Sequence, residues 1–193
     1  MAVMSSSDVP PGVFTPFRSL LLETARASIR CGLRDGRPLS PAPQGGPLAE
    51  PGACFVTLHL EDTLRGCIGT LEAHRPLLQD VAENAYAAAF RDPRFAPVSE
   101  AELERLHLHL SLLHSPQPLA CADEAQLHRR LEPGVHGLIF EAGGRRATFL
   151  PSVWEALPEP AAFVQQLKLK AGLEADYWSD QVRLWTYTTE GIE

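Results

Sequence analysis

Stretches with helical periodicity alternate along this chain with short strand-like runs, and few residues separate one from the next. Apolar residues spaced three or four positions apart predict helices at 15–32, 76–91 and 160–171. Alternating or compact apolar runs predict strands at 54–60, 64–70, 106–112, 134–141, 145–150 and 182–188. Because short connections favour antiparallel neighbours, we expect an α+β fold with mixed or antiparallel sheets and flanking helices.

Two segments lie outside this pattern. Residues 1–14 are mostly small or polar and contain prolines, so we expect a disordered N-terminus and a folded domain over 15–190. Segment 33–53 carries five prolines and four glycines. A loop of that length inside a compact domain is either functional or mobile, and the sequence leaves its role open.

The overall charge narrows the class of partner. Seventeen Lys and Arg residues stand against 24 Asp and Glu residues, which gives a net charge of −7. An acidic chain argues against nucleic-acid binding, which normally uses a basic domain. The weakest of our interpretations is a local basic patch that binds nucleic acid through Arg91, Arg94, Arg145 and Arg146.

Nothing in the sequence indicates export or a membrane span. The first basic residue is Arg18, and the longest uncharged stretch, 106–122, contains three histidines and two prolines. The four cysteines include no C-x-x-C pair, which argues against a zinc ribbon or a thioredoxin-like pair. We therefore expect a cytoplasmic protein with reduced thiols and no membrane association.

The most informative stretch is Leu64-Arg65-Gly66-Cys67-Ile68-Gly69-Thr70. Glycine inside a strand is costly and usually marks a bulge or a close approach by a ligand or another backbone. Strand alternation places Arg65 and Cys67 on one face, where the guanidinium would favour the thiolate. Cys67 is then a reactive or ligand-binding cysteine. The alternative, commoner on the pattern alone, is a small buried thiol beside glycines that sheet packing requires.

A second candidate is Arg91-Asp92-Pro93-Arg94-Phe95, which follows the helix at 76–91. Pro93 disfavours a helical conformation at Asp92, so the segment begins a loop. Arg91 and Arg94 have the donor geometry to bind a carboxylate or a phosphate. In the alternative, Arg94 pairs with Asp92 within the turn and braces the loop.

Other polar residues are explained by packing or solvation. His107 and His109 share one face of a strand as two metal ligands would, but the leucines between them take the buried face, so we expect solvated histidines and no metal site. Lys168 and Lys170 fit the last turn of a helix, where the dipole favours cations, and Trp154 fits a core. The chain contains no phosphate-binding P-loop, G-x-S-x-G or H-E-x-x-H motif, and we predict no cofactor.

Several ordered segments resemble the AMMECR domain family, in the prokaryotic type that belongs to AmmeMemoRadiSam systems. The segments that carry the resemblance are Phe55–Leu58, Leu64–Thr70, Ala88–Phe95, Gly144–Trp154, Phe163–Gly172 and Tyr187–Glu190. Together they span about residues 17–190, and Arg65–Gly69 matches the hallmark of the family without departure.

The resemblance implies a mixed α+β fold with a larger and a smaller lobe and a cleft between them. It also implies a modification pathway with Memo-like and radical S-adenosylmethionine (radical-SAM) proteins as partners, but it carries no established reaction to this chain.

With the resemblance added, we predict that the Arg65–Gly69 region binds a small molecule or a peptide. Whether the chain is an enzyme stays open at this point. In an enzyme, Cys67 would be the nucleophile or covalent anchor and Arg65 would stabilise negative charge. The predicted substrate-binding residues are Gly66, Ile68, Gly69, Thr70, Arg91, Asp92 and Arg94. The alternative is a non-catalytic adaptor that binds a partner, in which Cys67 is structural.

Overall fold

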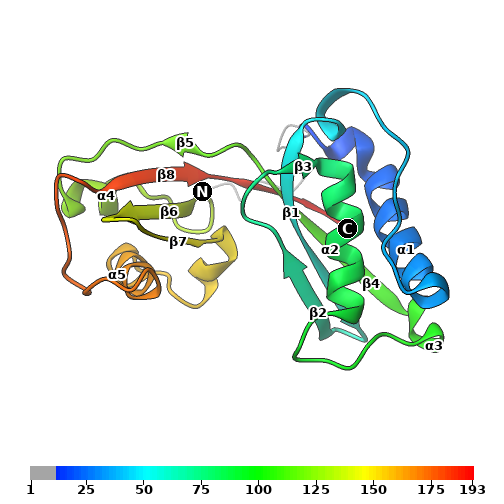
Figure 1. Cartoon of the computed structure of the whole chain (residues 1–193). Helices are drawn as coiled ribbons and strands as arrows, with labels where there is room; N and C mark the ends of the chain where they lie inside the picture. The colour runs from blue at the N-terminus through cyan, green and yellow to red at the C-terminus, as the bar shows by residue number, and fades with distance from the viewer. Residues whose placement is uncertain (1–11) are drawn as a thin grey trace, which may run out of the picture. The chain divides into compact units, whose positions relative to one another are not determined.

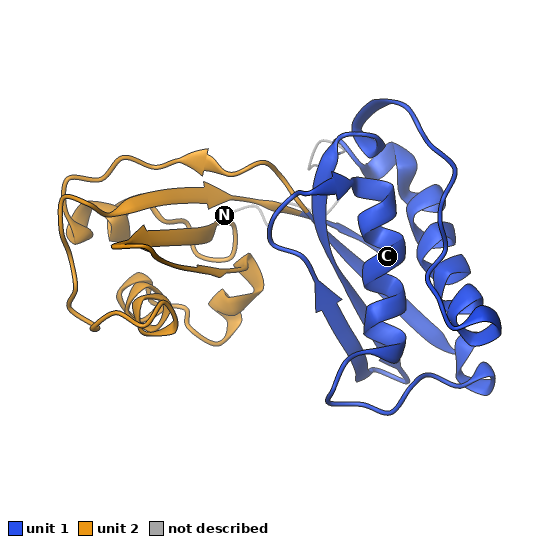
Figure 2. Ribbon diagram, in the orientation of Figure 1, with its two compact units in different colours: residues 1–112, 190–193 blue, residues 113–189 orange. Residues whose placement is uncertain are grey.

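Two units make up residues 12–193, the part of the chain that the computed structural model describes (Figure 2). Unit 1 runs to Leu112 and also takes up Glu190–Glu193, and unit 2 is Leu113–Thr189. Most of the segment expected to be disordered, residues 1–11, lies outside the described residues. Phe14 is described: it packs against the core of unit 1, and its backbone N–H donates to the Glu190 carboxylate.

Unit 1 is a sheet with two long helices on the same side (Figure 1). The strands are β1 (Pro51–Leu60), β2 (Thr63–Gly69), β3 (Arg75–Pro76), β4 (Leu106–Leu113) and β9 (Thr189–Ile192). Their order is β2-β1-β4-β9, and β3 pairs with β1. The helices are α1 (Arg18–Asp35), α2 (Leu77–Phe90) and the short α3 (Glu100–Leu103), with 3-10 turns at Thr15–Phe17 and Gly46–Leu48. The core includes Leu21, Ile29, Val56, Leu58, Val81 and Leu110.

Unit 2 is a second sheet whose order is β5-β8-β6-β7. These strands are β5 (Gln117–Pro118), β6 (Gly137–Ala142), β7 (Arg145–Phe149) and β8 (Arg183–Tyr187). Helices α4 (Glu124–Arg130) and α5 (Pro160–Lys170) and a 3-10 helix at Pro151–Glu155 complete the unit. In its core the Trp154 ring stacks on Phe163 with 3.8 Å between ring centroids, so Trp154 is a core residue.

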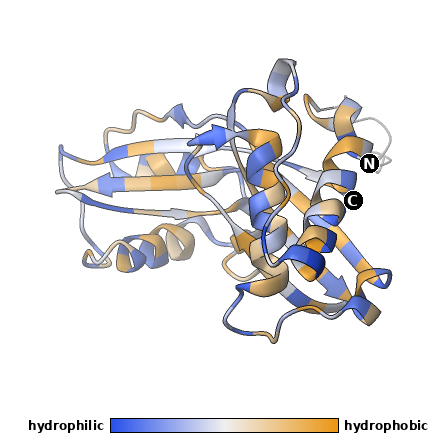
Figure 3. Cartoon of the chain, turned by 45° about the vertical axis from the view of Figure 1, so that its right-hand side comes forward, coloured by the Kyte–Doolittle hydropathy of each residue, from blue (hydrophilic) through white to orange (hydrophobic). Residues whose placement is uncertain are grey.

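The α+β fold with antiparallel sheets and flanking helices is confirmed, and every strand pair whose register is described runs antiparallel. Hydrophobic and hydrophilic residues lie side by side along the elements, as amphipathic helices and half-buried strands require (Figure 3). Two local features shape unit 1. Glu61 and Asp62, both with positive φ, form the turn that connects β1 to β2. Ser99 and Glu102 form the capping box of α3. Along residues 12–193, no helix combines the length and the apolar character needed to cross a membrane.

The proline- and glycine-rich segment is tied to unit 1 at several points. Helix α1 continues past Gly32 and ends at Gly36, whose φ of 66° suits a left-handed C-cap. Tyr86 donates to the Gly36 carbonyl and the Leu39 N–H donates to the Ser28 hydroxyl. Leu48, only 1% exposed, belongs to the core. The loop is therefore anchored at its start and near its end.

Candidate functional site

Cys67 lies on an edge strand of unit 1, since β2 is the first strand of the sheet. Thr57 of β1 is its cross-strand partner. On the other side, the Cys67 N–H donates to Asp92 Oδ2 at 2.9 Å and the Cys67 carbonyl accepts from Arg94 Nη2 at 3.3 Å. The loop after α2 therefore binds the backbone N–H and carbonyl of Cys67, which point outward from the sheet edge and would otherwise be free to pair with another strand.

Asp92 and Arg94 form a clamp that closes this edge. The Asp92 side chain is 2% exposed and accepts from Arg94 Nε at 2.9 Å, Nη2 at 2.6 Å and the backbone N–H at 3.1 Å. Arg94, together with the Cys67 N–H, holds the pKa of Asp92 well below its usual range. The ion pair between Arg94 and Asp92 that we considered for this turn is thus present. Through their hydrogen bonds to Cys67, the same two side chains connect the loop to β2.

The Cys67 side chain is half-buried and has two polar neighbours. Thr57 Oγ1 donates to the sulfur at 3.3 Å. The Arg94 guanidinium is the second neighbour, since its Nη2 donates to the Cys67 carbonyl at 3.3 Å, and the pairing with Asp92 raises the pKa of Arg94. Arg94 remains 54% exposed, and within residues 12–193 its third nitrogen, Nη1, has no hydrogen-bond partner. A thiol, a hydroxyl donor and a cation with a free donor therefore meet at one place.

Arg65 is directed elsewhere, although regular strand alternation predicts that it shares a face with Cys67, because the register of β1 and β2 shifts here and leaves Arg65 without a cross-strand partner. Its Nε donates to Glu102 Oε1 at 2.8 Å and its Nη1 to the Ala96 carbonyl at 2.8 Å. Its Nη2 lies 3.3 Å from both the Pro97 carbonyl and Glu102 Oε2. The guanidinium of Arg65 therefore braces the loop before α3, and Arg94 is the arginine that hydrogen-bonds to Cys67, through the backbone carbonyl.

Glu102 gives this brace a dependence on pH. Arg65 first, and then the N–H and hydroxyl of Ser99, lower the pKa of Glu102 to about 2. A carboxyl whose folded pKa is depressed contributes stability above its unfolded pKa and loses it as the pH falls towards the folded one.

We expect Glu102→Gln to lower the free energy of unfolding at pH 7 by about 2 kcal/mol, the size of a hydrogen bond to a charged group, because both side chains of the pair are at most 20% exposed. The difference from wild type should shrink as the pH falls from about 4.5 to about 2. Urea unfolding across this range measures it. A difference that stays constant with pH would show that the Glu102 charge plays no part.

The other residues of the motif serve packing. A Cβ on Gly66 would lie 2.2 Å from the Ala88 carbonyl oxygen of α2, and one on Gly69 would lie 2.3 Å from the Phe55 ring. Ile68 packs against the core of unit 1. Thr70 donates to Asp80 Oδ2 at 2.5 Å. Both glycines are thus needed for close approach by protein groups.

Sequence reasoning missed a buried polar cluster around Asp80. This carboxylate is fully buried and also accepts from the Cys54 N–H at 2.9 Å, Asn84 Nδ2 at 2.9 Å and Arg75 Nε at 2.8 Å. Burial, with the Asp80 charge in addition, raises the pKa of Cys54 well above its usual value, so this thiol stays neutral. The sequence does contain a pattern that indicates this cluster, because two polar residues, Asp80 and Asn84, lie four residues apart on the apolar stripe of α2.

The remaining candidates have surroundings of their own. Arg91 lies 4.9 Å over the Tyr86 ring of unit 1, whereas Arg145 and Arg146 belong to unit 2. His107 is exposed, and His109 Nδ1 lies 2.9 Å from the Glu193 carboxylate. Among the described residues, no three His, Cys, Asp or Glu side chains are placed to hold a metal ion.

Lys168 lies in the last turn of α5 as expected, but it is not a surface cation. Its side chain is fully buried, and its Nζ lies 2.9 Å from each Glu124 carboxylate oxygen and 3.2 Å from the Tyr177 carbonyl. A buried cation needs such a partner. Lys170, by contrast, is exposed and donates to the Thr148 carbonyl.

Comparisons with known proteins find similar sequences and a similar fold. A model of the AMMECR1 family matches residues 22–192. Protein MK0488 of Methanopyrus kandleri is 35% identical over 182 residues, which cover 90% of this chain and 86% of that protein. A protein of Thermotoga maritima is 39% identical over 138 residues, covering 70% and 74%. The crystal structure of an uncharacterized protein from Pyrococcus horikoshii is similar with a TM-score of 0.77 at 29% identity, covering 91% of this chain and 90% of that one.

Proposed function

This chain belongs to the AMMECR1 family, and on that premise we propose that Cys67 is the nucleophile or covalent anchor of a site that binds a small anionic molecule or peptide. The site would serve a modification pathway shared with radical-SAM and Memo-like proteins, as the resemblance to the prokaryotic AmmeMemoRadiSam type implies. The observation that carries the proposal is the half-buried Cys67 thiol with the Thr57 hydroxyl at 3.3 Å and the Arg94 guanidinium held at the Cys67 carbonyl.

Each neighbour has a chemical role in this proposal. A hydroxyl that donates to sulfur and an adjacent guanidinium are groups that favour a nucleophilic thiolate. The free Nη1 of Arg94 is available to receive a carboxylate or phosphate of the ligand, or negative charge that develops during reaction. Asp92 orients Arg94 and ties it to the backbone of Cys67. Arg65 positions the surrounding loop through Glu102 and does not act on the thiol itself.

The test is the rate at which iodoacetamide alkylates Cys67 in the folded protein, resolved from the other cysteines by peptide mass mapping. We expect Thr57→Val to slow this reaction at neutral pH by about fivefold, the factor that a hydrogen bond of about 1 kcal/mol represents. Thr57→Ser keeps the hydroxyl and should react like wild type. Cys54, which is fully buried, provides the rate of a protected thiol.

A second candidate function is a non-catalytic adaptor in which Cys67 is structural. It is favoured by the engagement of both Cys67 backbone groups and the Arg65 guanidinium in holding the fold together. If Cys67 is alkylated as slowly as Cys54, and Thr57→Val does not change that rate, the result supports the adaptor function. Cells that carry Cys67→Ser would then keep full function, and the protein would still capture its Memo-like neighbour.

A further inference from the structure

Phe55 is a half-buried aromatic residue of β1 that lies outside the core of unit 1. Its chain neighbours Cys54 and Val56 are fully buried in that core, so strand alternation directs Phe55 to the face of the sheet opposite the two long helices (Figure 1). Within residues 12–193, its ring packs neither against that core nor on another aromatic ring. A large apolar side chain is therefore presented on this face.

The Phe55 ring lies against the backbone of β2. Phe55 pairs with Gly69 in the register of β1 and β2. A Cβ on Gly69 would lie 2.3 Å from Phe55 Cγ and 2.4 Å from Cδ1, so the ring occupies the space that a side chain of residue 69 would need. This contact holds one side of the ring, and the rest of the half-buried side chain stays accessible.

The ring is also a neighbour of the Cys67 thiol. Thr57, whose hydroxyl donates to the sulfur, follows Phe55 by two residues on the same face and is the cross-strand partner of Cys67. Phe55 and Cys67 are therefore diagonal neighbours on two paired strands. Such residues lie about 7–8 Å apart, within reach of an aromatic side chain. The shift in register begins beyond Leu58 and leaves this arrangement regular.

The strand edge at Cys67 favours a small ligand over an extended peptide. A peptide that adds a strand to a sheet pairs with free backbone N–H and C=O groups at the edge. Both groups of Cys67 are already engaged, the N–H by Asp92 and the carbonyl by Arg94. The surface that remains beside the thiol consists of side chains, with the Phe55 ring as its aromatic part.

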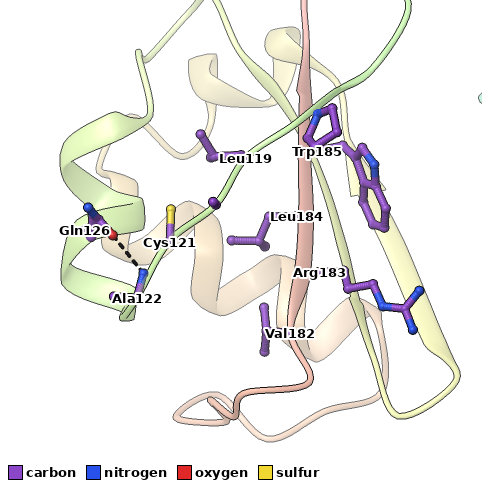
Figure 4. Close-up of a pocket in the computed structure, with 10 residues that line it drawn as sticks. Leu119, Cys121, Ala122, Gln126, Val182, Arg183, Leu184 and Trp185 are labelled. Atoms are coloured by element: carbon purple, nitrogen blue, oxygen red, sulfur yellow. Dashed lines mark hydrogen bonds between the residues drawn. The ribbon is translucent and has the colours of Figure 1, made fainter.

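Cys121 of unit 2 is a second half-buried thiol, with different neighbours. It lines a cavity of about 640 Å³ beside β8, together with Leu119 and Leu184 (Figure 4). Trp185 lines the same cavity, but in Figure 4 its ring lies on the other side of β8 from the thiol. Cys121 therefore meets aliphatic side chains in this cavity, which makes it the thiol to compare with Cys67.

We propose that Phe55 determines the specificity of the Cys67 site, and that the site takes a small molecule with an aromatic group beside the part that reaches the thiol. The ring of the ligand packs on the accessible part of the Phe55 ring, and its anionic group binds Arg94. Two aromatic rings in offset or edge-to-face packing attract each other beyond the burial of area. This inference rests on the proposed function and adds to it the aromatic class of the ligand.

The probes are iodoacetamide and N-benzyliodoacetamide, which carry the same reactive group without and with an aromatic ring. Their alkylation rates are measured on the full chain, with each cysteine resolved by peptide mass mapping. The ratio of the benzyl rate to the iodoacetamide rate is divided by the same ratio for glutathione, which offers no surface to the ring. We expect a normalised ratio of about five at Cys67, the factor that one aromatic contact represents, and a smaller ratio at Cys121.

Phe55→Leu is the discriminating variant, because it keeps an apolar side chain and removes the ring. We expect the normalised ratio at Cys67 to fall to that of Cys121. Both reagents attack the same sulfur, so a change in the thiol itself cancels from the ratio. Phe55→Tyr keeps the ring and should keep the ratio. Phe17→Leu is the matched control, since it removes a half-buried ring of unit 1 that packs against the core, and it should also keep the ratio.

The outcomes separate this inference from the proposed function. A normalised ratio at Cys67 that equals the ratio at Cys121, or one that Phe55→Leu leaves unchanged, would overturn the role of Phe55. The proposed function survives that result if iodoacetamide still alkylates Cys67 at a rate that depends on Thr57. If both reagents alkylate Cys67 as slowly as buried Cys54, the proposed function and this inference are both wrong.

Discussion

Replacing Gly66 with alanine is expected to lower the free energy of unfolding by about 3 kcal/mol, at the upper end of the usual cost of overpacking. The added methyl group would lie 2.2 Å from the Ala88 carbonyl oxygen, a backbone atom of α2 that cannot rotate away. Strand β2 and helix α2 would have to separate, and both the hydrogen bonds of Cys67 to Asp92 and Arg94 and the apolar contacts beneath them would weaken. Urea unfolding at neutral pH measures the change.

Gly45→Ala is the matched control, because Gly45 has a φ of −100° and a Cβ there would meet open space. This variant should unfold within about 0.5 kcal/mol of wild type, as surface substitutions usually do. If Gly66→Ala matched Gly45→Ala, Gly66 would not be the contact point between β2 and α2. A site for ligand approach would then become the better explanation of this glycine.

Local signals predicted the elements well because they act over a few residues. The leucines that alternate from Leu106 to Leu112 became the buried face of β4, and Ser99 and Glu102, three residues apart, form a capping box. The turn at Glu61-Asp62 also lies between the two strands predicted at 54–60 and 64–70. In each case the residues that decide the conformation are neighbours in the chain.

The partners of the candidate site were not predictable in the same way, because they come from distant parts of the chain. Strand alternation predicted Arg65 and Cys67 on one face, but the register of β1 and β2 shifts at Arg65, and Glu102, 37 residues later, binds its guanidinium. Asp92 reaches the Cys67 N–H across 25 residues only because the sheet order leaves β2 at an edge. Thr57 became the neighbour of the thiol through the register of β1 and β2.

Burial of polar side chains was likewise decided by tertiary structure. Lys168 is buried with Glu124, which lies 44 residues earlier, and nothing local to the helix distinguishes it from exposed Lys170. Asp80 did leave a local trace, since it interrupts the apolar stripe of α2 together with Asn84. A polar pair on a buried helix face therefore predicts a buried hydrogen-bond cluster, because an unpaired polar group there costs free energy.

Asp80→Ala is expected to lower the free energy of unfolding by about 3–5 kcal/mol, the range for removing one partner of a buried charge pair. The substitution leaves Arg75 without its carboxylate and the Cys54 N–H, Thr70 and Asn84 without their shared acceptor. Together these groups join β1, the end of β2 and β3 to α2. Urea unfolding at pH 7 measures the loss, and Glu83→Ala on the same helix should cost only about 0.5 kcal/mol or less.

The Cys54 amide separates the loss of this acceptor from a general loss of stability. Its N–H donates directly to Asp80 Oδ2 at 2.9 Å, so its hydrogen exchange in Asp80→Ala should accelerate by more than that of other β1 amides. Asp80→Asn keeps the shape of the side chain and one acceptor oxygen, and we expect an intermediate stability. Since Thr70 directly follows β2, the strand that carries Cys67 is held by Asp92 at its edge and by Asp80 at its end. If Asp80→Ala leaves both the stability and the Cys54 exchange rate unchanged, the edge clamp alone positions the thiol.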